Sequence, residues 1–321
     1  MKSIIILTEG GSNIGLGHIA RCKALYDEAV AQGYEVEFIV NTSDESIKLL
    51  EQVDVQYVDW CNFSFIQNKI KDYHNLIVDS YLVSKTVCEQ LVQQAGHCLI
   101  LDDLNRIDYP GNAMVVNLSL EASESRSHYY SGRDYIILRK PLTETRHKTI
   151  NQDVERVFIT LGSAGNQSTQ ALMKSLAGKY PYIHFYVLLA GDESVESLNQ
   201  THIHRLDQIG PDDMLEQIMQ ADIVITAAGQ TLLEVIRTQT PFIPIATADN
   251  QQNNVASLIN GGLNEKVIRI DSPMFYQDVL KQFERLLSYQ ERQKLSDELS
   301  GLIDGNGSKR VIQLLINGGQ D

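Results

Sequence analysis

The chain has 321 residues, with 27 Lys+Arg against 41 Asp+Glu and a formal net charge of −14 at pH 7. Its 43% hydrophobic residues exclude a disordered chain and are enough to bury a sizeable core. The acidic balance disfavours nucleic-acid binding, because that affinity comes largely from Lys and Arg contacts to phosphates. The length predicts two medium domains or one large one.

The cysteines and the apolar runs set further bounds. Cys22, Cys61, Cys88 and Cys98 form no CxxC pair and have no histidine cluster nearby, so we expect reduced core thiols rather than a zinc site or disulfides. No stretch approaches the roughly 20 apolar residues of a membrane-spanning helix. The N-terminal apolar run is too short for a signal peptide, so a cytoplasmic protein without an integral membrane segment is expected.

Short apolar runs alternate with amphipathic stretches from the first residues onward. In the first half, strands are predicted at 4–7, 36–40, 55–58, 76–78, 99–101, 115–116 and 135–138, with a helix that starts near His18. The polar stretch 140–155 contains a proline and is predicted to be a linker. Beyond it, strands are predicted at 157–161, 185–189, 223–226 and 242–245, and helices at 168–178, from Gln230, from Gln251 and from Phe275 onward.

This alternation predicts an α/β fold with two halves, each built on a parallel sheet. We place the first domain at 1–142 and the second at 143–321, with the last helix a candidate to pack back on the first domain. Ligands of open α/β sheets bind at the carboxyl ends of the strands. The sequence therefore predicts a site in the cleft between the two domains.

A glycine-rich loop joins the first predicted strand to the first helix. Gly15 and Gly17 allow the backbone to approach a ligand closely, and the exposed amides of a helix start favour an anion or a polar sugar group. His18 falls in the first helical turn, where the positive helix end disfavours imidazolium. A neutral His18 that can accept a proton suits a general base.

Two other interpretations of this loop stay open. Gly15, Gly17 and Ala20 formally fit the dinucleotide fingerprint GxGxxG/A. However, about seven residues separate the strand from the first glycine, and no acidic residue clearly ends the second strand. Alternatively, His18 is a helix N-terminal residue without any chemical role.

The second half contains a counterpart to this loop. A predicted strand ends in small residues, so the amides around Gly229 and the Thr231 hydroxyl form a cradle for a diphosphate without a lysine. Glu234 lies about one turn into the helix, where it can accept hydrogen bonds from a ribose diol. The alternative is a tight strand–helix turn in which Glu234 only complements the helix dipole. Two further polar loops are expected to face the same cleft, at 161–166 and at 246–252.

The order and spacing of these residues resemble the UDP-2,4-diacetamido-2,4,6-trideoxy-β-L-altropyranose hydrolases of pseudaminic acid biosynthesis and their spore-coat polysaccharide relatives, within the GT-B superfamily. The motifs in the first half are 14–22 (IGLGHIARC), 78–81 (VDSY), 101–103 (LDD), Asn117 and 135–139 (YIILR). Those in the second half are 228–234 (AGQTLLE), Pro241, 248–251 (ADNQ), 304–307 (DGNG) and Arg310. The resemblance implies a GT-B fold, in which two Rossmann-like parallel-sheet domains face a central cleft.

The resemblance also implies roles for individual residues. His18 is then the base that activates water at the anomeric carbon, with UDP leaving and the configuration inverting. The implied sugar-side residues are Gly15, Gly17, Arg21, Asp79, Tyr81, Gly162 and Ser163. The implied nucleotide-binding residues are Ala228, Gly229, Gln230, Thr231, Glu234, Asn250 and Gln251. No metal and no cofactor is implied, and for Asp102 and Asp103 we favour a structural role, as acceptors for backbone amides at a strand end.

The sequence departs from the family pattern at three places near the expected sugar. It has Leu7-Thr8-Glu9 where the family has Arg-x-Asp before the glycine loop, and Leu161-Gly162-Ser163-Ala164-Gly165 where a Gly-Gly-acid opening is usual. It also has Lys140-Pro141-Leu142 in place of an acid–Phe pair. These departures leave the sugar, and hydrolysis itself, open.

Three functions follow as hypotheses. The first is a hydrolase that removes UDP from a UDP-sugar, with His18 as base. The second is a GT-B glycosyltransferase of cell-surface glycan synthesis that passes the sugar to an acceptor. The third is a nucleotide-sugar-binding regulator without enzymatic activity. The absence of a concentrated basic run favours the hydrolase, because many peripheral glycosyltransferases carry basic patches for anionic membranes.

Overall fold

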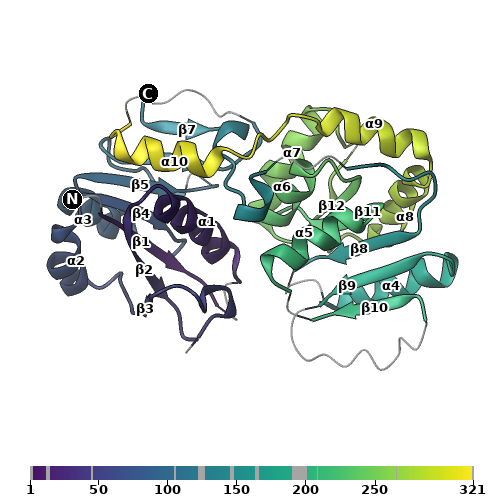
Figure 1. Cartoon of the computed structure of the whole chain (residues 1–321), viewed down its shortest axis with the longest axis horizontal. Coiled ribbons are helices and arrows are strands. Elements are labelled where there is room, and N and C mark those ends of the chain that lie inside the picture. Colours follow the sequence, from purple (N-terminus) through teal and green to yellow (C-terminus); the bar gives the residue numbers. More distant parts are fainter. Residues whose placement is uncertain are drawn as a thin grey trace. The chain divides into compact units, whose positions relative to one another are not determined.

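The computed structural model describes residues 3–11, 15–44, 46–104, 106–121, 127–144, 148–162, 166–189, 201–207, 209–264 and 266–319. The chain divides into two compact units, one formed by Met1–Thr143 with Gly305–Asp321 and the other by Glu144–Asp304 (Figure 1). Each unit contains one sheet with helices packed on it. Among the described residues, no helix combines the length and the apolar character needed to cross a membrane.

The first unit is built on a seven-stranded parallel sheet in the order β3-β2-β1-β4-β5-β6-β7. Its strands are β1 (Ser3–Glu9), β2 (Glu35–Asn41), β3 (Val55–Tyr57), β4 (Asn75–Asp79), β5 (His97–Leu101), β6 (Met114–Asn117) and β7 (Tyr129–Ser131). The apolar run at the start of β1 is fully buried, as expected for a strand covered on both faces. The order places β1 beside β4, so their carboxyl ends meet at one edge of the sheet.

Helices cover both faces of this sheet. They are α1 (Gly17–Ala31), α2 (Phe63–Lys69), α3 (Lys85–Gln94) and α10 (Gly307–Ile316). Ile5 and Leu7 of β1 share a core cluster with Ile66 of α2 and Leu91 of α3. The last helix, α10, packs against α1, β4 and β5, although it comes from the far end of the chain (Figure 1).

The second unit has a six-stranded sheet in the order β10-β9-β8-β11-β12-β13, again parallel. Its strands are β8 (Arg156–Thr160), β9 (His184–Leu188), β10 (Ile203–Leu206), β11 (Ile223–Ala227), β12 (Phe242–Ala246) and β13 (Ile268–Arg269). Its helices are α4 (Asn166–Lys179), α5 (Pro211–Gln220), α6 (Gln230–Arg237), α7 (Gln252–Asn260), α8 (Phe275–Leu286) and α9 (Tyr289–Leu299). The predicted α/β fold with a parallel sheet in each half is confirmed.

One predicted strand is wrong. Residues 135–138 do not join the sheet: a short 3-10 turn covers Arg133–Tyr135, and the strand that pairs with β6 is β7. Ile136, Ile137 and Leu138 are buried all the same. A Cβ on Gly307, the first residue of α10, would lie only 2.0 Å from the Ile136 carbonyl oxygen, so α10 packs directly on this backbone. An apolar run signals burial, and here the burial comes from a helix rather than from strand neighbours.

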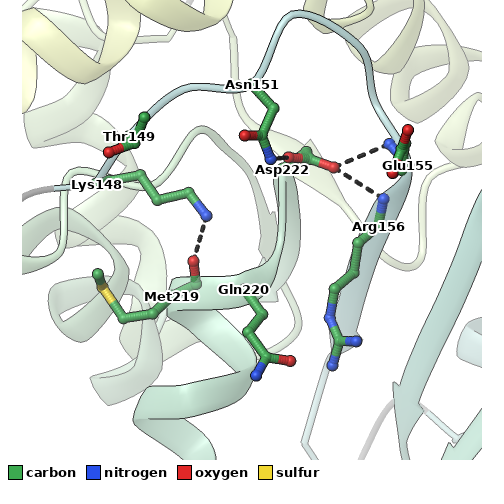
Figure 2. A pocket seen from close by; sticks show the side chains of 8 residues that line it. All are labelled: Lys148, Thr149, Asn151, Glu155, Arg156, Met219, Gln220 and Asp222. Carbon is green, nitrogen blue, oxygen red and sulfur yellow. Dashed lines mark hydrogen bonds between the residues drawn. The ribbon is translucent and has the colours of Figure 1, made fainter.

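The second part of the polar stretch predicted as a linker, from Lys148 to Glu155, is attached to the second unit by hydrogen bonds (Figure 2). Asp222 accepts hydrogen bonds from the Asn151 amide at 2.8 Å and from the backbone N–H groups of Glu155 and Arg156, both at 2.9 Å. The Lys148 ammonium donates to the Met219 carbonyl, and burial lowers the pKa of Lys148 to about 8. This polar segment is therefore not a loose linker. The buried carboxylate of Asp222 holds it in place.

These residues line a hollow together with Thr149 and Gln220 (Figure 2). The hollow lies where β8 and β11 begin, as Arg156 and Asp222 show. Ligands of parallel sheets bind at the opposite edge, where the strands end. We therefore place the candidate site of the second unit at the strand ends and not in this hollow.

Candidate active site

The loop between β1 and α1 is shaped by its glycines. Gly11 and Gly15 exchange backbone hydrogen bonds of 3.0 and 2.8 Å, which closes the loop on itself. Gly15 has a φ of +90°, a left-handed conformation that favours glycine, and no described atom lies within 4 Å of the place of a Cβ. Gly17 is the first residue of α1, and no described side chain caps this helix start. Gly15 and Gly17 thus lie between the first strand and the first turn of α1, where the sequence places them.

His18 is held by a carboxylate from the neighbouring strand. Its Nδ1 lies 2.7 Å from Oδ1 of Asp79, the last residue of β4, and the two side chains are 9% and 0% exposed. An ionised carboxylate accepts hydrogen bonds only. Arg21 Nη2 also lies 3.1 Å from Nδ1, but it donates to the same Asp79 Oδ1 at the shorter distance of 2.7 Å, so we assign the Nδ1–H to the Asp79 contact and Nε2 as the basic nitrogen. The contact spans 61 positions in sequence and follows from the β1–β4 pairing.

Arg21 lies one turn further along α1 and donates hydrogen bonds to the same carboxylate. Its Nε and Nη2 donate to the two oxygens of Asp79 at 2.5 and 2.7 Å, and its Nη1 donates to Asp103 at 2.5 Å. Burial alone would raise the pKa of Asp79, but the Arg21 and His18 charges and hydrogen bonds outweigh it and hold this pKa well below its usual range. Asp79 is therefore a permanent anion behind His18.

The structure revises the expected roles of three charged residues. Asp79 is fully buried and holds His18 and Arg21, so it does not face an open sugar site as the sequence suggested. Arg21 directs its donors to Asp79 and Asp103, which makes it a positioning residue. Asp103, which was expected to accept backbone amides, forms an ion pair with this guanidinium. The role expected for Asp102 is confirmed: it accepts from the backbone amides of Leu104 and Arg106.

Tyr81 follows β4 and contacts the candidate base. Its ring meets the His18 ring edge-on, with centroids 4.5 Å apart and planes at 90°. The loop that carries Tyr81 is held by Glu9 at the end of β1 and by Arg106 beyond β5. In the sequence, Glu9 stands out only as a departure from the family pattern, and Arg106 does not stand out at all. No local pattern marks Arg106, because its partners are backbone carbonyls 25 and 26 positions earlier.

The second unit presents a loop between β11 and α6, as predicted. Gly229 precedes the first turn of α6 and has no side-chain cap among the described residues. The loop is braced by the segment after β12: the Asn254 amide donates to the Ala228 carbonyl at 3.0 Å, and a Cβ on Gly229 would lie 3.6 Å from Gln251 Nε2. Gln251 in turn accepts from the Thr247 amide at 2.9 Å. The sequence predicted that Gln251 and the loop 246–252, which includes Thr247, face the nucleotide, but it gave no sign of Asn254.

The other predicted nucleotide and sugar residues lie as follows. Gln230 and Thr231 are half-buried in the first turn of α6, and Glu234 on the same helix is fully buried. Asn250 lies in the short turn Asp249–Gln251 that precedes α7. Gly162 follows β8 with a φ of +73° and is exposed, whereas Ser163 lies outside the described residues. Three predicted loops of this unit thus follow the strands β8, β11 and β12.

The four cysteines are free thiols, as expected. Cys22, Cys88 and Cys98 are buried and Cys61 is partly so. Burial raises the pKa of Cys61 to about 11 and that of Cys88 to about 12, so both are protonated at neutral pH. Cys22 lies 3.6 Å from Asp79 and also stays a thiol, because burial and this carboxylate raise its pKa.

Comparison with known proteins defines the class. Residues 156–300, within the second unit, match the glycosyltransferase family 28 C-terminal domain. MurG of Acinetobacter baumannii superposes with a TM-score of 0.70 at 14% identity, over 99% of this chain and 100% of that one. The glycosyltransferase SnogD of Streptomyces nogalater does so with a TM-score of 0.57 at 15% identity, over 97% and 99%. The chain has the GT-B fold.

A sequence relative of known name gives more specific information than the shared fold. Over 245 residues the chain is 24% identical to the pseudaminic acid cytidylyltransferase and UDP-2,4-diacetamido-2,4,6-trideoxy-β-L-altropyranose hydrolase of Helicobacter pylori. The matched region is 74% of this chain but only 43% of that protein, so the chain spans less than half of its relative. Together with the fold and the family 28 match, this relative supports an enzyme related to nucleotide sugars in glycan biosynthesis.

Proposed function

We propose that the protein is a sugar-nucleotide hydrolase that releases UDP from a UDP-linked sugar of the diacetamido-trideoxy type, in nonulosonic acid or surface polysaccharide biosynthesis. The observation that carries the proposal is the buried Asp79–His18 pair, with Nε2 of His18 left as the basic nitrogen. The Helicobacter pylori relative, whose name includes such a hydrolase, supports the same reaction.

In the proposed reaction His18 acts as a general base. A water oxygen attacks the anomeric carbon while the bond from that carbon to the UDP oxygen breaks. The water proton passes to Nε2 of His18, the electron pair of the broken bond leaves with UDP, and the configuration inverts. The imidazolium that forms is stabilised by the Asp79 carboxylate at 2.7 Å, which has no need to accept the proton itself.

The nucleotide is assigned to the second unit. A diphosphate fits the open N-terminus of α6, where backbone N–H groups and the positive end of the helix dipole favour an anion. The amides of Gly229, Gln230 and Thr231 are assigned to this anion, because the Ala228 N–H already donates to the Ile245 carbonyl at 2.8 Å, and Gln251 braces the loop. Such a site needs no basic surface, which agrees with a net charge of −14.

The test is hydrolysis in water labelled with heavy oxygen. The wild-type protein is incubated with a panel of nucleotide sugars, and products are analysed by mass spectrometry and by NMR of the anomeric proton. We expect the label on the free sugar, none in UDP, and the inverted anomer first. Label in UDP means attack at phosphorus and overturns the proposal, as does a failure to consume any donor of the panel.

A second candidate is a glycosyltransferase with the same GT-B fold, favoured by the family 28 match over 156–300. In that case the base deprotonates an acceptor hydroxyl instead of water. An acceptor-dependent product with negligible release of free sugar in water decides for the transferase. A UDP-release rate that added acceptors leave unchanged decides for the hydrolase.

A further inference from the structure

The loop after β4 aims a ring at the candidate base. Tyr81 is half-buried, and its ring meets His18 edge-on at 4.5 Å. Asp79 and Arg21 Nη2 both contact the imidazole at Nδ1, so these contacts fix one atom and leave the ring free to tilt about it. The perpendicular Tyr81 ring supplies a second contact, so the direction of Nε2 depends on where Tyr81 is held.

Glu9 holds the amide side of this loop. The side chain is fully buried at the end of β1, and one oxygen accepts from the Tyr81 backbone N–H at 2.7 Å. The other oxygen accepts from the Leu82 N–H at 3.2 Å and from the Ser80 hydroxyl. A buried carboxylate with three donors fixes the backbone of the loop, because each of these groups would lose its partner if the loop moved.

Arg106 holds the carbonyl side. Its two terminal nitrogens donate to the Tyr81 carbonyl at 2.8 Å and to the Ser80 carbonyl at 2.7 Å, and its guanidinium carbon lies 5.3 Å from the centroid of the Tyr81 ring. Arg106 is itself fixed, because its backbone N–H donates to Asp102 at 2.8 Å. The planar fork of an arginine can hold two carbonyls at once, whereas a lysine ammonium cannot reproduce that geometry.

We propose that Glu9 and Arg106 are positioning residues that clamp residues 80–82 and thereby hold Tyr81 against His18; as a role in catalysis this rests on the proposed function. The clamp carries opposite charges on the two sides of one loop, and within the described part of the chain neither residue has a hydrogen bond to His18. Its effect on the base passes through Tyr81. Loosening the clamp is expected to lower the rate of the chemical step and leave nucleotide binding in the second unit unchanged.

The kinetic test compares Arg106→Gln and Arg106→Lys with Arg133→Gln, a control that removes an exposed arginine of the same unit. A misplacement of about 1 Å at a catalytic group can cost about 10²-fold in rate, so we expect kcat of Arg106→Gln to fall by about 10- to 100-fold. The Kd of UDP, measured by calorimetry, stays as in the wild type. Arg106→Lys falls between the two, because its ammonium keeps the charge and can hold one of the two carbonyls but not the geometry of both.

The second readout needs no substrate and separates this inference from the proposed function. The His18 ring protons, assigned by their loss in His18→Gln, lie in the ring-current field of Tyr81. Their NMR shifts in Arg106→Gln are expected to move towards those of Tyr81→Leu, while Arg133→Gln keeps the wild-type shifts. If no nucleotide sugar is consumed, the proposed function fails, yet these shifts still report on the clamp.

The inference is overturned if folded Arg106→Gln keeps the wild-type His18 shifts or the wild-type kcat. Melting of each variant is followed by circular dichroism. Should Arg106→Gln fail to fold, the same two measurements on Arg106→Lys decide, with wild-type shifts and kcat again contradicting the clamp. Glu9→Gln provides the independent arm: its amide nitrogen faces N–H donors, and we expect the same displacement of the His18 signals.

Discussion

The two units hold their strand-end loops by different means. In the first, ionised side chains do so: Glu9 and Arg106 hold the loop after β4, while Asp79 and Arg21 fix His18. In the second, the loop before α6 is braced by the neutral amides of Asn254 and Gln251. The difference agrees with the proposed roles of the two units. Charged groups that orient an imidazole suit proton transfer in the first unit, whereas neutral amides in the second leave the N-terminus of a helix available to an anion.

The largest effect is expected for Asp79→Asn, which tests whether the first unit carries the chemistry and the second unit binds the nucleotide. An amide NH2 facing His18 forces Nδ1 to accept, so Nε2 carries the proton and cannot act as base. We expect kcat to fall by about 10³-fold, as tautomer errors in other His–Asp pairs do, with the Kd of UDP unchanged. Steady-state kinetics and calorimetry measure both, and Asp108→Asn serves as an exposed control in the same unit. Equal losses in both quantities would contradict the division.

The pH dependence of stability tests the same charge arrangement around Asp79. The pKa of Asp79 is lower in the folded protein than in the unfolded chain, so its contribution to stability is fully present above the unfolded pKa and is lost as pH falls towards the folded one. We expect the difference in unfolding free energy between wild type and Asp79→Asn to shrink by about 2 kcal/mol as the pH falls below about 5. Urea titrations at several pH values below about 5 measure it, and a difference that grows as the pH falls through this range contradicts the charge arrangement.

The glycine loop offers a matched pair of substitutions. Gly15 and Gly17 both have open space at the place of a Cβ, but only Gly15 has a left-handed φ. Gly15→Ala is therefore expected to lower the free energy of unfolding by about 1–2 kcal/mol, whereas Gly17→Ala changes it by less than about 0.5 kcal/mol. Chemical denaturation of the two variants measures this, and equal effects would show that backbone conformation is not what requires Gly15.

The smallest effect is expected in the second unit. Gln251→Ala removes the acceptor of the Thr247 amide beside the Gly229 loop, and the loss of such a hydrogen bond corresponds to about a 3- to 10-fold weaker Kd for UDP. At saturating substrate kcat should change by less than about 2-fold, because no group at His18 is altered. Gln252→Ala, at the exposed neighbouring glutamine, is the control. A drop in kcat without a change in Kd would assign Gln251 to the chemistry instead.

Much of the fold could be predicted from the sequence, because its signals are local or follow from one another. The alternation of buried runs and helices predicted the two parallel sheets, and the doubly wound order brings β4 beside β1. That adjacency joins two motifs named separately, at His18 and Asp79. Hydrophobic periodicity alone does not connect the motif at His18 with the motif at Asp79. The resemblance to the GT-B hydrolases does, because it implies that both motifs lie in the same domain and the same site.

The rest of the site depends on long-range contacts that leave no local pattern. Arg21 and Asp103 are 82 positions apart, and a strand-end aspartate next to another gave no reason to choose between an amide and a guanidinium as partner. Arg106 donates to backbone carbonyls, and because every residue has one, the sequence does not indicate which carbonyls an arginine will bind. Residues 135–138 were assigned to the sheet because their burial was visible in sequence, whereas the helix that buries them begins at Gly307.

The most direct test of the account is His18→Gln, assayed for UDP release at saturating nucleotide sugar and for UDP affinity on the same sample, with His184→Gln as an exposed control. Loss of a general base lowers kcat by about 10²- to 10⁴-fold, and the account predicts that loss together with a wild-type Kd for UDP. Unchanged turnover, or a loss of turnover explained by a loss of UDP binding, would contradict the assignment of the chemistry to the first unit.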